Sequence, residues 1–176
     1  MLEIEDWSKE QVHQVMQELL VSFNYMWFLM EGWIKDNCPE KADSEAFHQI
    51  SETFGAYQAK RLAKTIADPG QGTARLIQFL KHSHWCAFEN IEFSNISGKE
   101  LRMRTLDCTA QKAAKKWGMD CYDCSKAGLR LRQGFFAQVD PTARVTRVHT
   151  PPDEKPAALP ETVSCEWRIC IQSRGA

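Results

Sequence analysis

Cysteine is the residue type whose number and spacing in this sequence could do the most specific chemistry. Five of the seven cysteines lie in the second half of the chain, and two of them, Cys121 and Cys124, form a Cys-x-x-Cys pair. That spacing lets two sulfur atoms bind one metal ion or form a small redox disulfide. A structural zinc site needs four ligands, and the sequence contains no second pair of this kind. The further ligands must therefore come from Cys108, His149 and Cys165.

The strand predicted near the C-terminus carries Cys165 and Cys170 on opposite faces, because side chains alternate along a strand and these two are an odd number apart. Cys165 shares its face with Trp167 and Ile169, which makes that face the core side. Cys124 is predicted to begin a helix, where backbone amides favour a thiolate. These observations predict a metal site, holding zinc or an iron centre, with the ligands Cys108, Cys124, Cys165 and His149.

Two other roles are open for the same thiols. Free cysteine is among the most often buried residues and frequently acts as a small hydrophobic side chain, so a structural role is the plainest alternative. A nucleophilic or redox role would fall on Cys121 or Cys124. The sequence assigns no catalytic residue.

Two further pairs of residues are candidates for binding a small ligand. Trp27 and Glu31 are one helical turn apart, and a carboxylate against an indole could be an acid of raised pKa or hold a ligand. The alternative is a solvated carboxylate at the edge of a helix. Gln111 and Lys112 could meet an anionic ligand, although a charged segment of this kind is usually a solvated helix face.

Positive charge is concentrated in the second half of the chain, where an anionic ligand or partner could bind. No phosphate-binding glycine loop, Ser-His-Asp order or zinc-protease signature is present. His13 and His48 have polar neighbours and are predicted to lie on the surface. The arginines that make up the positive charge are Arg102, Arg104, Arg130, Arg132, Arg144, Arg147 and Arg168.

The elements that must position these residues follow from hydrophobic periodicity. Ser8, with Gln11 three residues later, has the spacing of a capping box and begins the first helix. The turn residues at 97–99 separate two alternating segments, which predicts a β-hairpin. The later helices are predicted over 22–36, 44–66, 72–82, 109–118 and 124–138, and the strands over 86–95, 100–107, 143–149 and 162–171.

The order of these elements predicts an α+β protein with one antiparallel sheet of about four strands, in the order hairpin, helices, hairpin. Residues 1–84 form the helical part, and residues 85–176 form the part that contains the sheet and the cysteines. No repeat or linker demands a second domain, so we expect a single domain over 1–176.

Composition excludes several classes of protein. With 43% hydrophobic and 26% charged residues, the chain has the composition of a globular protein, and its formal net charge is −1. Binding of nucleic acid by bulk electrostatics needs a concentrated basic face, so we expect none. No apolar segment is long enough to span a bilayer, and the acidic first residues do not resemble a signal peptide. We therefore expect a cytoplasmic protein that does not bind membranes.

The second half of the chain contains an ordered set of motifs: Cys108-x-x-Gln111-Lys112-Ala113, Gly118, Cys124-x-Lys126-x-Gly128, Phe136-Ala137-x-x-Asp140-Pro141, Pro151-Pro152-Asp153 and Cys165-x-Trp167. This set resembles a family of uncharacterised bacterial and archaeal proteins, which is distantly similar to the 2-amino-thiazoline-4-carboxylate hydrolase family. The sequence departs from the family's pattern at Ala114, where an arginine is expected, and at Arg147 and Thr150, where cysteines are expected.

Three functions are consistent with this sequence. The first is a small-ligand-binding or sensory protein whose cysteines hold a metal or shape the ligand site. The second, implied only by the distant resemblance, is a hydrolase acting on a carbon–nitrogen bond of a small cyclic substrate. The third is a structural interaction protein, which would show a broad apolar surface. A homo-oligomer is compatible with each of them.

Overall fold

The computed structural model describes residues 7–68 and 70–172. The chain divides into two compact units, Met1–Asp43 and Ser44–Ala176, which are described separately below. None of the helices in these described residues is long and apolar enough to cross a membrane. The expectation of one domain stays a prediction.

The first unit contains one long helix, α1 (Lys9–Asn37), followed by one turn of helix, α2 (Pro39–Ala42). The predicted capping box is present: the Ser8 hydroxyl accepts from the Gln11 amide at 3.2 Å, and the Gln11 side chain accepts from the Ser8 amide at 2.8 Å. The prediction of two helices before residue 37 was wrong, because no glycine or proline interrupts the helix near residue 22.

The second unit begins with α3 (Glu45–Leu62), α4 (Gly72–Lys81) and α5 (His84–Phe88). The Ser44 side chain caps α3 by accepting from the Phe47 amide at 3.2 Å. The short helix α5 lies where the sequence predicted the start of a strand. His48 is 8% exposed, so its prediction as a surface residue was wrong.

The four strands form one antiparallel sheet in the order β1-β2-β4-β3. In the two central strands, Thr105 of β2 lies opposite Cys165 of β4, and Met103 lies opposite Trp167. These four side chains therefore lie on the same face of the sheet. The sheet together with the helices makes this an α+β protein, as predicted. The strands are β1 (Asn90–Ser97), β2 (Glu100–Asp107), β3 (Ala143–His149) and β4 (Cys165–Ile171).

Two helices lie in the chain between β2 and β3. The first, α6 (Thr109–Lys116), follows β2 directly with Cys108 as its N-terminal cap residue. Gly118 follows α6 with φ of +81°, a conformation that suits glycine at a helix end. The second, α7 (Ala127–Val139), begins three residues later than predicted, so Cys124 lies in the preceding loop and not in the first turn of a helix.

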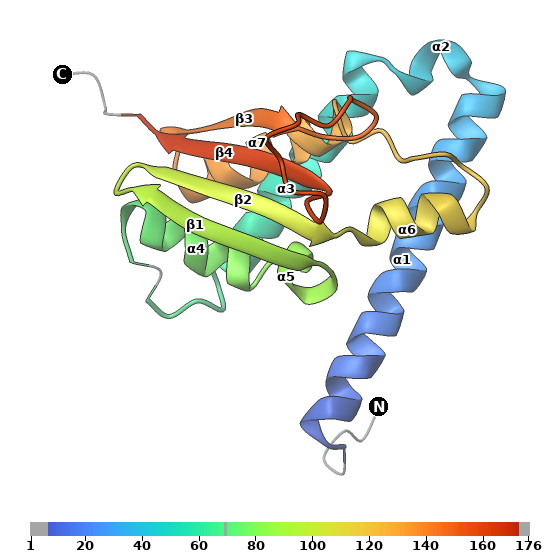
Figure 1. Ribbon diagram of the computed structural model, residues 1–176. Coiled ribbons are helices and arrows are strands. Elements are labelled where there is room, and N and C mark those ends of the chain that lie inside the picture. The colour runs from blue at the N-terminus through green and yellow to red at the C-terminus, as the bar shows by residue number, and fades with distance from the viewer. Residues whose placement is uncertain (1–6, 69, 173–176) are drawn as a thin grey trace. The chain divides into compact units, whose positions relative to one another are not determined.

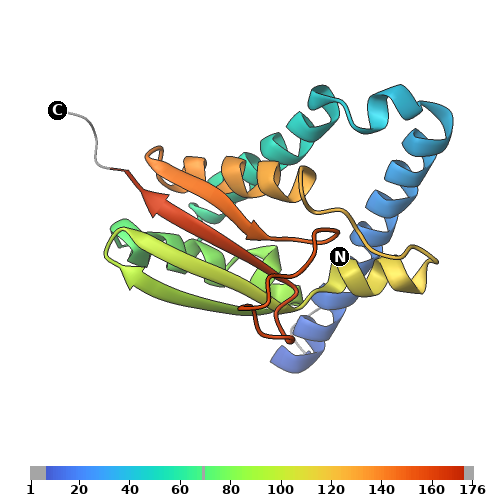
Figure 2. The same cartoon turned by 45° about the horizontal axis from the view of Figure 1, so that its top comes forward.

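The core of the second unit lies between the sheet and helices α3, α4 and α7, which cover one face of the sheet (Figures 1 and 2). Trp85, at the start of α5, packs edge-on against Phe135 of α7 with ring centroids 5.1 Å apart. The largest fully buried side chains come from both layers: Leu76, Phe79, Leu80, Phe135 and Phe136 from helices, and Leu101, Met103, Trp167 and Ile169 from strands.

Candidate functional site

Three segments that are distant in sequence meet beside the end of β2 and the start of β4. Cys108 lies just beyond β2, and Cys165 begins β4 opposite Thr105. Glu89, between α5 and β1, contacts this end of the sheet through both carboxylate oxygens. Its Oε1 accepts from the Cys108 thiol at 3.6 Å, and its Oε2 accepts from the Thr105 hydroxyl at 3.3 Å. Glu89 therefore joins a buried thiol to the sheet.

Cys124 reaches the same region on a loop that Gln111 holds in place. The Gln111 amide nitrogen donates to the Tyr122 carbonyl at 2.7 Å and to the Cys124 sulfur at 3.7 Å. Its oxygen accepts from the Tyr122 amide at 3.0 Å. The Cys124 amide in turn donates to the Pro151 carbonyl at 3.2 Å. Gln111 thus positions the loop that carries the thiol.

The guanidinium of Arg132 is buried between two indole rings. Its central carbon lies 4.8 Å from the ring centroid of Trp85 and 4.2 Å from that of Trp167. The residue is only 5% exposed; its Nη1 donates to the Gly128 carbonyl at 3.1 Å, while Nε has no hydrogen-bond partner. Among the described residues, no carboxylate lies within ion-pair distance of it. Stacking on indoles stabilises the cation but leaves its charge uncompensated at close range.

Gly128 allows these groups to approach one another. A Cβ at this position would lie 3.2 Å from the Cys124 Cβ, 3.5 Å from an Arg132 nitrogen and 3.8 Å from the Trp167 ring. The Trp167 indole also donates to the Cys165 sulfur at 3.2 Å. We call Glu89, Cys108, Cys124, Arg132 and Cys165 the thiol–carboxylate cluster.

Electrostatic interactions connect the members of the thiol–carboxylate cluster. Burial raises the pKa of the Cys124 thiol to about 12, with Arg132 opposing the shift and Cys165 and Glu89 adding to it. The pKa of Cys108 is also raised, by burial first and then by Glu89 and Cys124. Burial raises the pKa of Glu89, again against Arg132. Both thiols are therefore protonated at neutral pH, and each added negative charge opposes the next.

His149, the predicted nitrogen ligand, is buried at the end of β3. Its pKa is lowered by burial and by Lys155, while Asp153 opposes the shift. Within the described part of the chain, the charged groups that act on His149 are Lys155, Asp153 and Arg147, and no hydrogen bond joins its ring to a thiol. Within the same residues, no three His, Cys, Asp or Glu side chains stand in an arrangement that could hold a metal ion. The four-ligand site stays a prediction.

The predicted ligand-binding residues have different environments. Lys112 forms an exposed ion pair with Asp107 at 2.6 Å, whereas Gln111 is part of the loop clamp described above. Trp27 is half-buried and Glu31 is buried, both in α1 of the first unit. Glu31 is therefore not a solvated carboxylate at a helix edge, and a ligand-binding role for Trp27 and Glu31 stays a prediction.

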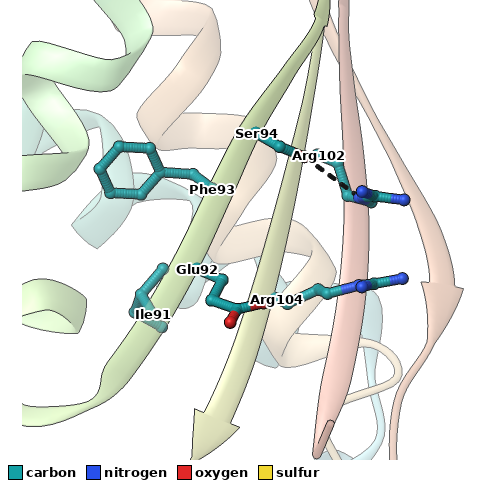
Figure 3. Close-up of a pocket in the computed structure, with 6 residues that line it drawn as sticks. All are labelled: Ile91, Glu92, Phe93, Ser94, Arg102 and Arg104. Carbon is teal, nitrogen blue, oxygen red and sulfur yellow. Dashed lines mark hydrogen bonds between the residues drawn. The ribbon is translucent and has the colours of Figure 1, made fainter. Parts of the chain in front are cut away.

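Two surface hollows occur in the second unit, and no residue of the thiol–carboxylate cluster lines either of them. One, of about 390 Å³, is formed by β1 and β2 (Figure 3). Its lining comes from both faces: Ile91 and Phe93 point to one side, whereas Arg102 and Arg104 point to the other (Figure 3). The polar lining residues Glu92 and Ser94 lie opposite Arg104 and Arg102 across the hairpin, and Arg102 Nε donates to the Ser94 hydroxyl at 3.2 Å. The other lies along the exposed side of α3, at Ala46, Gln49, Ile50, Thr53, Phe54 and Tyr57.

Sequence reasoning missed Glu89 as a member of the site and gave Arg132 no specific role. Arg132 did carry a signal: it lies four residues after Gly128 and three before Phe135, so helical spacing places it on the buried face of α7. Glu89 carried none, because its approach to Cys108 depends on how β1 pairs with β2. The third thiol, Cys165, was correctly placed on the core face by strand alternation.

Comparison with known proteins gives one match. Residues 6–171 match the model of a family of unknown function (DUF6125). A search of curated proteins and a search of solved structures found no match. The resemblance to an uncharacterised family is thus confirmed, while the distant similarity to a hydrolase family stays a prediction. Since the match spans nearly the whole chain, the protein belongs to this family of unknown function.

Proposed function

We propose that this protein is a small-ligand-binding or sensory module, and that its ligand, a soft divalent cation such as Zn²⁺, binds at the thiol–carboxylate cluster. One observation carries the proposal. Thiols from three separate segments gather with a half-buried carboxylate, and the Cys108 sulfur lies 3.6 Å from the Glu89 oxygen.

The donor set favours a soft cation. Sulfur and carboxylate oxygen are both zinc ligands, and three cysteines with one further donor is a common composition for a structural zinc site. A bound cation would deprotonate the thiols, whose raised pKa values reflect burial and mutual repulsion. Glu89 replaces His149 as the fourth ligand in this proposal, because Glu89 already contacts Cys108.

Arg132 fits the charge of such a site. Three thiolates and one carboxylate carry two more negative charges than a divalent cation neutralises, and a neighbouring guanidinium would offset part of that excess. Arg132 lowers the pKa of both Cys124 and Glu89. Its position between two indole rings keeps it from turning away. We therefore assign Arg132 to charge compensation and not to coordination.

Each donor is already held by a neighbour, and the described residues show no ready metal-holding arrangement, so a cation would require these side chains to rearrange. Gln111 holds Cys124, the Trp167 indole holds Cys165, and Glu89 itself holds Cys108. Closing these donors around a cation would tie β2, β4 and the loop before α7 together. Such a change in rigidity on binding is a suitable output for a sensory module.

Zinc titration of the full chain tests this proposal. We would purify the protein without oxygen or chelator, measure its metal content, and titrate its thiols before and after adding Zn²⁺. We expect one zinc per chain and protection of three thiols from a thiol reagent. Cys124→Ser should abolish stoichiometric binding, and Glu89→Gln should weaken it about 10- to 100-fold.

Cys170→Ser is the matched control, because Cys170 lies on the face of β4 opposite to Cys165. The Cys170→Ser variant should bind zinc as the wild type does. Failure to bind zinc by the folded wild type, with all thiols titrating freely, would overturn the proposal. Equal losses in Cys124→Ser and Cys170→Ser would also overturn it. Circular dichroism of each variant separates loss of the site from loss of the fold.

A hydrolase is the second candidate, and the Cys108–Glu89 pair favours it, because a thiol beside a carboxylate can act as nucleophile and base. Two observations weigh against it. The pKa of Cys108 is raised, so the thiol is not activated, and Cys165 packs against the Trp167 indole. Hydrolysis of 2-amino-thiazoline-4-carboxylate by the wild type, lost in Cys108→Ser and kept in Cys170→Ser, would establish this function instead.

A further inference from the structure

Helix α1 carries an exposed apolar stripe with a seven-residue repeat. The seven members follow one another at alternating spacings of four and three residues, and all are large and apolar. Their exposed fractions run from 40% for Val12 to 63% for Phe23. We call these residues the α1 seam: Val12, Met16, Leu19, Phe23, Met26, Met30 and Trp33.

A repeat of this kind has a specific structural meaning. Apolar residues spaced on average 3.5 positions apart keep one narrow stripe facing a partner helix along the whole length of a coiled coil. The α1 seam continues for three repeats, and no polar residue interrupts it. A helix that presents one solvated face to water would place charged or polar residues at such positions.

The buried residues of α1 do not belong to the α1 seam. Glu31 is the buried residue of this helix, while Asn24, Trp27 and Ile34 are half-buried. These positions follow one another at helical spacing on a face adjacent to the α1 seam. The α1 seam is therefore a second apolar surface on the same helix.

The area of the α1 seam is of the size that stable dimers bury. Seven large apolar side chains, exposed by 40–63%, leave on the order of 800 Å² accessible, close to what one partner contributes to a standard protein interface. Monomeric proteins rarely expose contiguous apolar patches larger than a few hundred Å². Covering the α1 seam should therefore be strongly favourable.

We propose that the α1 seam docks against the α1 seam of a second copy of this chain, forming a two-fold coiled-coil dimer. A heptad stripe is complementary to itself, which is what a two-fold interface requires. It also contains no charge that a partner of different chemistry would have to neutralise. The proposal is independent of the thiol–carboxylate cluster, which belongs to the other unit.

Sedimentation velocity of the full chain, over roughly 1–100 μM, tests the dimer. We expect the wild type to sediment as two chains of 20.2 kDa each. The double variant Leu19→Glu/Met26→Glu places two charges in the α1 seam and should raise the dissociation constant at least about 100-fold, because buried unpaired charges are costly.

The control variant is Gln14→Glu/Val21→Glu, which adds the same charge on another exposed side of α1 and should stay within about 3-fold of the wild type. Three outcomes would overturn the proposal: a wild-type monomer at the highest concentration, equal dissociation in both double variants, or a monomer that binds lipid vesicles through α1. Circular dichroism of the variants confirms that α1 still folds.

Discussion

Replacing Gly134 of α7 with alanine should destabilise the second unit, because α3 and α7 cross there with their backbones in contact. A Cβ at Gly134 would clash with the Glu52 carbonyl group, its distance to the carbonyl carbon being 2.8 Å. Gly55 of α3 is equally close to α7. A Cβ at Gly55 would clash with the Leu131 carbonyl group and lie 2.9 Å from the Phe135 amide nitrogen. Real Cβ atoms essentially never approach other heavy atoms within 3.0 Å.

Two opposing effects set the size of the change. Alanine is favoured over glycine inside a helix by about 1 kcal/mol. Overpacking costs about 1–3 kcal/mol or more, and the upper end applies at Gly134 because a backbone carbonyl cannot rotate away as a side chain can. The expected net loss is about 2 kcal/mol, which for a chain of this size lowers Tm by roughly 4–8 °C.

Urea unfolding followed by circular dichroism measures the effect. Gly32→Ala in α1 is the matched control, because no atom lies within 4 Å of a Cβ there. That substitution should stabilise α1 by up to about 1 kcal/mol through helix propensity alone. We expect the free energy of unfolding to fall in Gly134→Ala and to rise in Gly32→Ala. Stabilisation by both would refute the backbone crossing of α3 and α7.

Two further predictions concern charge. The ion pairs Arg104–Glu166 and Lys112–Asp107 have the same length, 2.6 Å, but different side-chain exposure, 21% and 5% against 67% and 52%. Double-mutant cycles should therefore give a coupling above about 1.5 kcal/mol for the first pair and below about 0.5 kcal/mol for the second; equal couplings would contradict this. Burial and Arg132 lower the pKa of His84 in the folded state to about 3. As pH falls below about 6.5, the His84 side chain is therefore protonated in the unfolded state before it is protonated in the folded state. Stability should fall with acid between about pH 6.5 and 3, and His84→Gln should flatten that fall in a urea-midpoint profile.

Local signals in the sequence predicted the local features of the fold well. Ser8 and Ser44 are both helix caps, because a capping interaction needs only residues three positions away. The division of α1 into two helices was wrong because it relied on polar residues near Asn24 as a boundary. Polar residues alone do not end a helix, which requires a glycine, a proline or a competing cap.

Features that depend on distant segments were predicted less well. Residues 124–126 were predicted as the start of a helix, yet Cys124 is held in the loop before α7 by the Pro151 carbonyl and by Gln111. His149 was named as a ligand from its place in the sequence alone, and the structure buries it at the end of β3, where an irregularity in the pairing with β4 lies between Arg147 and His149. Neither contact has a signal within a few residues in the sequence.

The position of Arg132 shows how the fold and the candidate site depend on one another. Gly134 and Gly55 let α7 approach α3 closely, and this fixes where the residues of α7 meet the sheet. Two residues before Gly134, that approach places a guanidinium between Trp85 and Trp167, beside Cys124. Arg132 lowers the pKa of both Cys124 and Glu89 from that position, so the close crossing of α3 and α7 also sets the electrostatics of the thiol–carboxylate cluster.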